Sequence, residues 1–224
     1  MIYMTSDCFG CDLNDVKDLL KKAAFRENDF CFVLGNVVDR GENGVKLLEW
    51  LMEQYNVELL RGCHEQLLLA HAYLFGPDAV PALTATQTAL LQKWNELGAM
   101  PTVTALKAKK AEAREYIFEF LEDTPLFETV NAGGRDFILT HSGLGSFAPD
   151  KKLSAYSETE LLWHDADTTD RYFDHATVVH GHTPTGDLAG GDEGKIYFGE
   201  TFIDVNAGTP ALLRLDDLKA FYLD

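Results

Sequence analysis

The chain has 224 residues, and its content of 46% hydrophobic and 25% charged residues is typical of one globular α/β domain. The formal net charge of −17 disfavours a nucleic-acid partner, because a strongly negative surface repels phosphate groups. No apolar run approaches the ~20 residues needed to cross a bilayer, so no membrane association is expected. The negative charge is explained by a role in solubility, or by a surface that binds basic partners or concentrates cations near the site.

The N-terminal residues lack a basic segment followed by an apolar core, so we expect no secretory signal. The four cysteines, at positions 8, 11, 31 and 63, do not resemble a disulfide framework. Cys8 and Cys11 have C-x-x-C spacing, but a second such pair is missing, so a structural zinc site is not expected. These features predict a reduced, cytoplasmic protein.

Short apolar segments alternate with amphipathic ones through the first third of the chain. Strands are expected at residues 1–5, 30–34 and 57–60, and helices at residues 13–24 and 44–55 and from Glu65 onward. Asp12 is placed to cap the first helix. This alternation predicts a parallel sheet covered by helices.

Residues 76–123 differ in character, because Pro77, Pro81 and Pro101 punctuate them and strand-like runs are absent. Helices are predicted at residues 86–97 and 103–121. We interpret the stretch as a helical insertion, or cap over the site, within a single domain spanning residues 1–224.

The last part of the chain is rich in short apolar segments separated by turn residues. A hairpin is predicted from residues 126–130 and 137–140, and further strands at residues 177–179, 196–198, 201–205 and 211–215. These segments suggest a second, mainly antiparallel sheet. The expected fold class is therefore α/β, a two-sheet β-sandwich flanked by helices.

Each of five predicted strand ends carries a polar or metal-ligating side chain beside a glycine. The segments are Ser6-Asp7-Cys8-Phe9-Gly10, Gly35-Asn36-Val37-Val38-Asp39-Arg40-Gly41, Arg61-Gly62-Cys63-His64-Glu65, His141-Ser142-Gly143-Leu144 and His180-Gly181-His182-Thr183-Pro184. Ligands bind at the carboxyl ends of strands in open α/β sheets, so these segments are expected to converge on one site.

These five blocks, in this order, resemble the motifs of calcineurin-like metallophosphoesterases, of the bacterial type related to serine/threonine phosphoprotein phosphatases. The family pattern reads Asp-x-His-Gly, Gly-Asp-x-Val-Asp-Arg-Gly, Gly-Asn-His-Glu, His-x-Gly-Leu and Gly-His-Thr-Pro. The resemblance spans nearly the whole chain and implies the family's sandwich fold and phosphoester hydrolysis.

Four positions depart from the family pattern. Phe9 stands where the family has a metal-binding His, and Asn36 where it has the Asp that bridges two metals. Cys63 replaces the ligand Asn, and Asp165 stands where bacterial relatives carry a phosphate-binding Arg. The resemblance therefore implies a degenerate metal site.

The resemblance also implies catalytic roles for three retained residues. Asp39 would orient His64, and His64 would be the general acid that protonates the leaving oxygen. Arg40 would bind the substrate phosphate in forked geometry.

For metal binding, His141 and His182 match the family's second site, whereas only Asp7 matches the first. Cys63, together with the two histidines and with Asn36 or Asp7 as an oxygen donor, forms a set that favours zinc. Alternatively, Cys63 is a neutral replacement in an inactive pocket. At most one divalent metal per chain, zinc or manganese, is expected, or none.

Two functions from different classes follow. One is a weak or single-metal phosphoesterase that acts on phosphoproteins or small phosphoesters. The other is a pseudophosphatase, a binding or regulatory module without turnover.

Trp94 and Leu106, which fall where related phosphatases have similar residues, are interpreted as core. Surface or structural roles are expected for His71, His164, His175 and His180.

Overall fold

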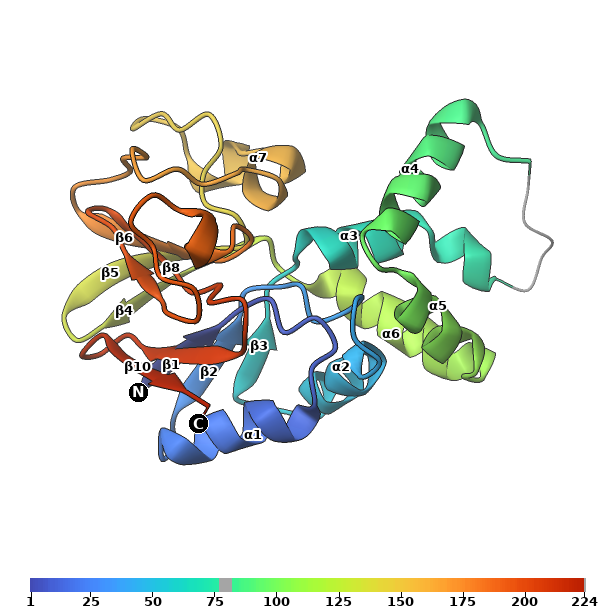
Figure 1. The fold of residues 1–224 in the computed structure, drawn as a ribbon, viewed down its shortest axis with the longest axis horizontal. Helices are drawn as coiled ribbons and strands as arrows, with labels where there is room; N and C mark the ends of the chain where they lie inside the picture. The colour runs from blue at the N-terminus through green and yellow to red at the C-terminus, as the bar shows by residue number, and fades with distance from the viewer. Residues whose placement is uncertain (77–81, 224) are drawn as a thin grey trace.

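The computed structural model describes residues 1–76 and 82–223, which form two packed sheets with helices around them (Figure 1). The strands are β1 (Ile2–Thr5), β2 (Phe30–Val33), β3 (Val57–Leu59), β4 (Phe127–Ala132), β5 (Arg135–Thr140), β6 (Ala176–His180), β7 (Tyr197–Phe198), β8 (Phe202–Asp204), β9 (Ala211–Arg214) and β10 (Lys219–Tyr222). The helices are α1 (Leu13–Lys22), α2 (Gly44–Met52), α3 (Cys63–Ala70), α4 (Ala85–Glu96), α5 (Met100–Lys107), α6 (Ala111–Asp123) and α7 (Glu158–Leu162). The predicted two-sheet α/β sandwich is confirmed.

The first sheet has the strand order β10-β9-β1-β2-β3, and its centre is parallel as predicted. Alternate residues of β1 and β2 pack into two different hydrophobic cores, one on each face of the sheet. Tyr3 and Cys31 pack with the helices, whereas Met4 and Phe32 pack against the second sheet. The Asp12 side chain caps α1, as its position in the sequence predicts.

The second sheet has the order β4-β5-β6-β8-β7. Its predicted β4–β5 hairpin is confirmed, but the expectation of a mainly antiparallel sheet is wrong. Strands β5, β6 and β8 run parallel, β9 joins the first sheet, and β10 was not predicted. The error arises because short strands separated by turn residues look alike whether the chain turns back or crosses over.

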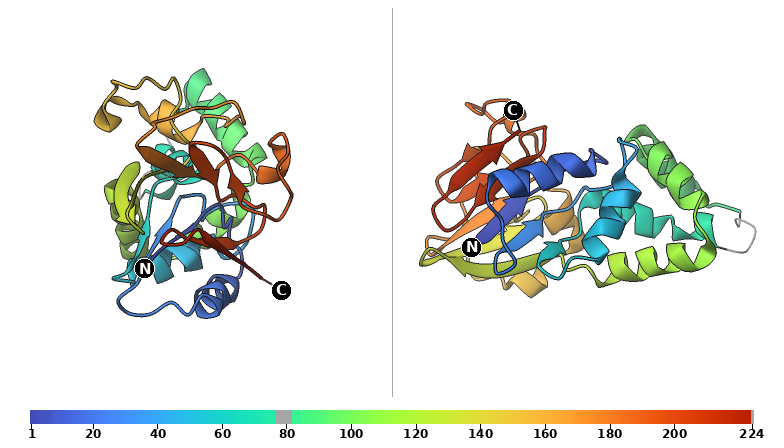
Figure 2. Two further views of the ribbon diagram at one scale, coloured as in Figure 1. Left: turned by 90° about the vertical axis from the view of Figure 1, so that its left-hand side faces the viewer. Right: turned by 90° about the horizontal axis from the view of Figure 1, so that it is seen from below.

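The stretch predicted as a helical insertion contains α4, α5 and α6, which extend from one side of the sheets (Figures 1 and 2). The predicted continuous helix over residues 103–121 is wrong, because Lys110 adopts an extended conformation between α5 and α6. The reversal allows both helices to contact α2 and buries Leu106 and Ile117. Tertiary packing therefore overrides the helix propensity of this segment.

No helix within residues 1–76 and 82–223 is long and apolar enough to cross a membrane. Pro77 and Pro81, which helped to delimit the insertion in the sequence, lie outside the described residues.

Candidate functional site

The five polar segments meet where β1, β2, β3, β5 and β6 end, as the sequence predicts. Two hydrogen bonds tie the sheets together at this edge. Nδ1 of His141 lies 2.6 Å from the carbonyl oxygen of Leu34, and the backbone N–H of His182 donates to Oδ2 of Asp7 over 2.9 Å. The strand ends of both sheets thus form one cluster.

The backbone of this cluster is locally strained. Six residues other than glycine have left-handed φ angles between 40° and 70°: Asp7, Phe9, Asn36, Asp39, Arg40 and His182. Such conformations cost roughly 1–3 kcal/mol each and persist only where the surroundings enforce them. They concentrate at functional sites, and here they coincide with the positions selected from the sequence.

Glu65 holds the loop between β2 and α2 in this shape. Its fully buried carboxylate accepts hydrogen bonds from the backbone N–H groups of Asn36 (2.7 Å), Val37 (2.9 Å), Val38 (3.2 Å) and Gly62 (2.9 Å). Burial raises the pKa of Glu65, and the backbone donors oppose that rise. Sequence reasoning used Glu65 only as a helix start. Its position three residues after the cap of α3 is the signal that was missed.

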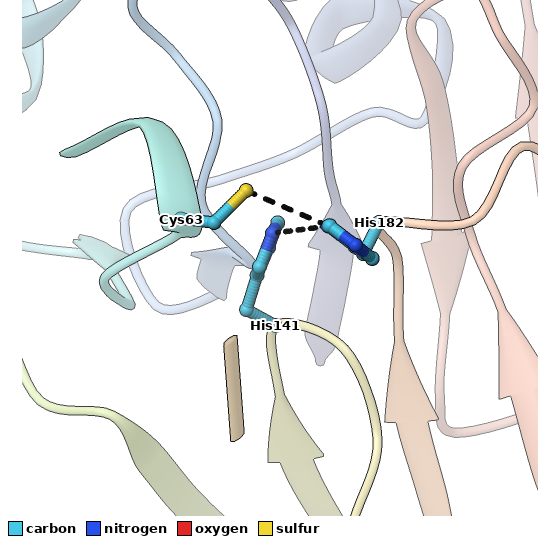
Figure 3. A group of neighbouring side chains, drawn as sticks. All are labelled: Cys63, His141 and His182. Carbon is cyan, nitrogen blue, oxygen red and sulfur yellow. Dashed lines mark hydrogen bonds between the residues drawn. The ribbon is translucent and has the colours of Figure 1, made fainter. Parts of the chain in front are cut away.

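Cys63, His141 and His182 point toward one another (Figure 3), and their ligand atoms all lie within 4.8 Å of one another. Sγ of Cys63 lies 3.5 Å from Nδ1 of His182, which lies 3.2 Å from Nε2 of His141. Because the Leu34 carbonyl can only accept, Nδ1 of His141 carries the proton, and its Nε2 lone pair faces the other two side chains.

Burial sets the protonation of this group. It lowers the pKa of His141 to about 3 and that of His182 to about 4, so both imidazoles are neutral at pH 7. Burial, reinforced by the charge of Asp7, raises the pKa of the Cys63 thiol above its ordinary value. Two neutral imidazoles and a thiol that can ionise are a donor set that fits one zinc ion.

Asn36 is the residue that the resemblance aligns with the bridging carboxylate. Its Nδ2 donates to Oδ1 of Asp7 over 2.7 Å, and its Oδ1 accepts from the backbone N–H of His64 (3.0 Å) and the thiol of Cys63 (3.5 Å). The amide cannot turn round, because a carboxylate only accepts and a backbone N–H only donates. Oδ2 of Asp7 bonds the N–H of His182. Both Asp7 oxygens thus accept hydrogen bonds from neutral groups, and the Asn36 amide supplies no anionic oxygen to bridge two metals.

Asp39 and His64 are paired as the resemblance implies. Nδ1 of His64 lies 2.7 Å from Oδ2 of Asp39, and both side chains are buried. The same oxygen accepts a 2.7 Å hydrogen bond from Nε1 of Trp94, and Thr102 accepts one from the Asp39 N–H. Trp94 is core, as expected, but it also orients this pair. A single tryptophan 55 residues away gives no sequence pattern that would reveal this contact.

Phe9 lies between two of the predicted catalytic residues. Its ring meets the ring of His64 edge to face at 5.0 Å, and the guanidinium of Arg40 lies 3.8 Å from its centroid. Phe9, which the resemblance aligns with a metal-binding His, is thus an apolar ring in a cation–π contact with Arg40.

Asp165 lies beside the metal-binding group and not within it. Its side chain is 96% exposed, and its Oδ1 lies 3.8 Å from Nε2 of His182. The ring of the nearby Trp163 meets the ring of His182 edge to face, with centroids 6.1 Å apart.

The other residues assigned structural roles have identifiable surroundings. Leu106 is fully buried core, and His71 stacks on Trp94. Three further contacts involve histidines: His164 with Asp170, His175 with Phe173, and the buried His180 with Asp204. None of these four histidines belongs to the metal-binding group found among the described residues.

Comparison with known proteins agrees with this architecture. The family model for calcineurin-like phosphoesterases matches residues 1–219. Comparison with curated proteins gives no match. Among solved structures, one provisionally described as a diadenosine tetraphosphatase has a TM-score of 0.66 at 13% identity, with 99% of this chain and 92% of that chain covered.

Two further solved structures share the fold. A protein serine/threonine phosphatase from Saccharomyces cerevisiae has a TM-score of 0.61 at 16% identity, and a cold-active protein-tyrosine phosphatase from a Shewanella species has 0.55 at 13%. Each comparison covers 100% of this chain and 80% of the other. With the family model spanning almost all of its length, the chain belongs to the calcineurin-like phosphoesterase family.

Proposed function

We propose that the protein is a phosphoester hydrolase of reduced activity that works with one metal ion held by Cys63, His141 and His182. The observation that carries this proposal is the convergence of one sulfur and two imidazole nitrogens, while the Asn36 amide occupies the bridging position. Such a donor set suits zinc and leaves one tetrahedral position for a ligand.

A metal bound there would polarise a phosphoryl oxygen and acidify a bound water. The protein's own groups supply the remaining steps. Arg40, whose side chain is exposed, offers forked donors to the phosphate. His64, oriented by Asp39, protonates the leaving oxygen, and the buried carboxylate stabilises the imidazolium before transfer. Without the second metal, the attacking water is less activated, so turnover is low.

The proposed substrates are phosphoproteins or small phosphoesters, in the manner of bacterial serine/threonine phosphatases, and the proposed location is the cytoplasm. We also propose that residues 1–224 form one domain with residues 76–123 as its cap. The contacts of Trp94, Thr102 and Gly98 with Asp39 and Arg40 support this assignment.

The rival proposal is a pseudophosphatase that binds a phosphoester without turnover. It is favoured by the mutual hydrogen bonding of Asp7, Asn36 and Cys63, which satisfies these side chains without an ion. Phe9, packed on Arg40 and His64, adds an apolar surface where the family has a metal ligand.

Hydrolysis of phenyl phosphate by the zinc-loaded protein tests the two proposals. Turnover that is lost in both His64→Ala and Cys63→Ala would support the hydrolase. Saturable binding of inorganic phosphate without turnover in the wild type would support the pseudophosphatase. Absence of both binding and turnover would contradict both.

A further inference from the structure

The Asp165 carboxylate lies near His182, on the side of the ring away from the other two ligand atoms. In the Cys63, His141 and His182 group, the nitrogen of His182 that meets the other two ligand atoms is Nδ1. Its other nitrogen, Nε2, lies 3.8 Å from Oδ1 of Asp165. One ring thus connects the proposed metal position to an exposed carboxylate.

A metal at Nδ1 of His182 would determine which nitrogen of the ring carries the proton. The neutral His182 ring carries one proton, and a metal at Nδ1 requires that proton to be on Nε2. The N–H would then be directed to the side on which Asp165 lies. A carboxylate that accepts from the far nitrogen of a ligating histidine fixes its tautomer and makes it a stronger ligand.

The backbone around Asp165 is fixed to the ligand-bearing loops on both sides. The N–H of His164 donates to Oγ of Ser142 over 3.1 Å, and the N–H of Ala166 donates to Oγ1 of Thr183 over 3.0 Å. Ser142 follows the ligand His141, and Thr183 follows the ligand His182. These two bonds therefore fix the backbone position of Asp165 relative to both histidines, even though its side chain is exposed.

The ring of His182 is also held in place. Trp163, at the C-terminal end of α7, meets the His182 ring edge to face at 81°. The segment 163–166 thus places an aromatic ring and a carboxylate beside His182, and two of its backbone N–H groups bond the loops that carry the ligands. The N–H of Ser142, in the loop that follows β5, donates to the carbonyl oxygen of Leu161 in α7 over 3.1 Å.

From this geometry we propose that Asp165 is a positioning residue for the metal, accepting a hydrogen bond from Nε2–H of His182 when the metal is bound. The substitution of the family's Arg by Asp then serves metal binding instead of phosphate binding. The negative charge compensates in part for the neutral amide of Asn36, which gives the cation no anionic bridge. The inference rests on the proposed function only for the presence of the metal.

Zinc affinity, measured by competition with a chelator, tests this role. Asp165→Asn should raise the zinc Kd by about tenfold, at the lower end of the ~10–100-fold range for outer-shell partners, because the carboxylate is exposed. Asp165→Glu should recover most of the affinity. Asp174→Asn, at another exposed aspartate, is the matched control for net charge and should change the Kd less than about twofold.

Nitrogen-15 NMR of the zinc-loaded protein supplies a readout that a change in folding or net charge would not imitate. His182 should carry its proton on Nε2 and bind zinc through Nδ1. Zinc on Nε2, or an Asp165→Asn variant as tight as wild type, would overturn the proposal. Phenyl phosphate turnover is measured on the same samples. A zinc effect without turnover would leave this inference standing and remove only the hydrolase.

Discussion

The indole nitrogen of Trp94 lies 2.7 Å from Oδ2 of Asp39, the same oxygen that pairs with Nδ1 of His64. Trp94 belongs to α4, whereas Asp39 lies in the loop after β2 and His64 in the first turn of α3. The insertion therefore contributes directly to the orientation of the proposed acid pair.

Trp94→Phe removes this donor while retaining an aromatic ring. Because the buried Asp39 loses a hydrogen-bond partner, we expect phenyl phosphate turnover to fall by about tenfold and stability by about 1–3 kcal/mol. Zinc content should be unchanged. Rates and urea denaturation measure the two effects, and Trp50→Phe, at a half-buried tryptophan of α2, is the control. Equal losses in both variants would indicate packing alone.

The donor set predicts one tightly bound transition metal per chain. Elemental analysis of protein purified without chelator, together with anomalous scattering, should find a single ion at Cys63, His141 and His182. Cys63→Ala should weaken zinc binding at least ~100-fold, because loss of a ligand exceeds the ~10–100-fold effect of outer-shell changes. Two ions about 3.5–4 Å apart, the spacing of a dinuclear site, would refute this prediction.

Zinc binding should release about one proton near pH 7. The raised pKa of Cys63 keeps the thiol protonated in the metal-free protein, whereas the lowered pKa values of His141 and His182, about 3 and 4, leave both imidazoles neutral. Zinc affinity should therefore rise about tenfold per pH unit from pH 6 to 8. Calorimetry in buffers of different ionisation enthalpy counts the proton. A pH-independent affinity would contradict the assignment of a protonated thiol.

Restoring the family pattern should create or greatly raise Mn²⁺-dependent activity. The variant combines Phe9→His, Asn36→Asp, Cys63→Asn and Asp165→Arg, and Asn36→Asp should matter most because it restores the anionic bridge. Single changes should do little, since residues that act as one unit are strongly non-additive. Rates are compared with wild type, and His64→Ala in the same background is the control.

The structure adds a condition to this prediction. Asn36→Asp alone places a second carboxylate where the amide now donates to Asp7 over 2.7 Å, so the metal-free single variant should be destabilised and Mn²⁺ should restore its stability. If the quadruple variant folds and binds two metals yet remains inactive, the helical insertion is the first segment to test for exclusion of substrate.

Glu65→Ala should cost about 3 kcal/mol or more of unfolding free energy. Four backbone N–H groups would lose their buried acceptor at once. Urea denaturation measures the loss, with Glu119→Ala, at an exposed position of α6, as control. A loss below about 1 kcal/mol would mean that the loop between β2 and α2 holds its shape without Glu65.

The sequence predicted the strand ends well because each motif is local. Gly62, Cys63 and His64 adjoin one another, and the rule that strand ends share an edge brings them to Asn36 and His141. Strand pairing in the second sheet was not predictable in this way, because the pairing of β6 with β8 depends on contacts between distant residues.

The polar contacts of the site are not encoded in any local stretch of the sequence. Nothing near Asn36 in the sequence tells which way its amide points, because the direction is set by Asp7 and His64, 29 and 28 residues away. The same holds for Trp94 and Asp39. Such bonds decide which ions the site can hold, and they are invisible to any local pattern.

The hydrogen bond from the His182 amide to Asp7 has a dynamic consequence, because it joins the ends of β1 and β6, which belong to different sheets. That amide proton exchanges with solvent only when its bond to the Asp7 carboxylate opens. Its exchange rate therefore reports local opening at this edge of the two sheets. Any ion bound by Cys63 and the two histidines would slow the exchange of this amide proton.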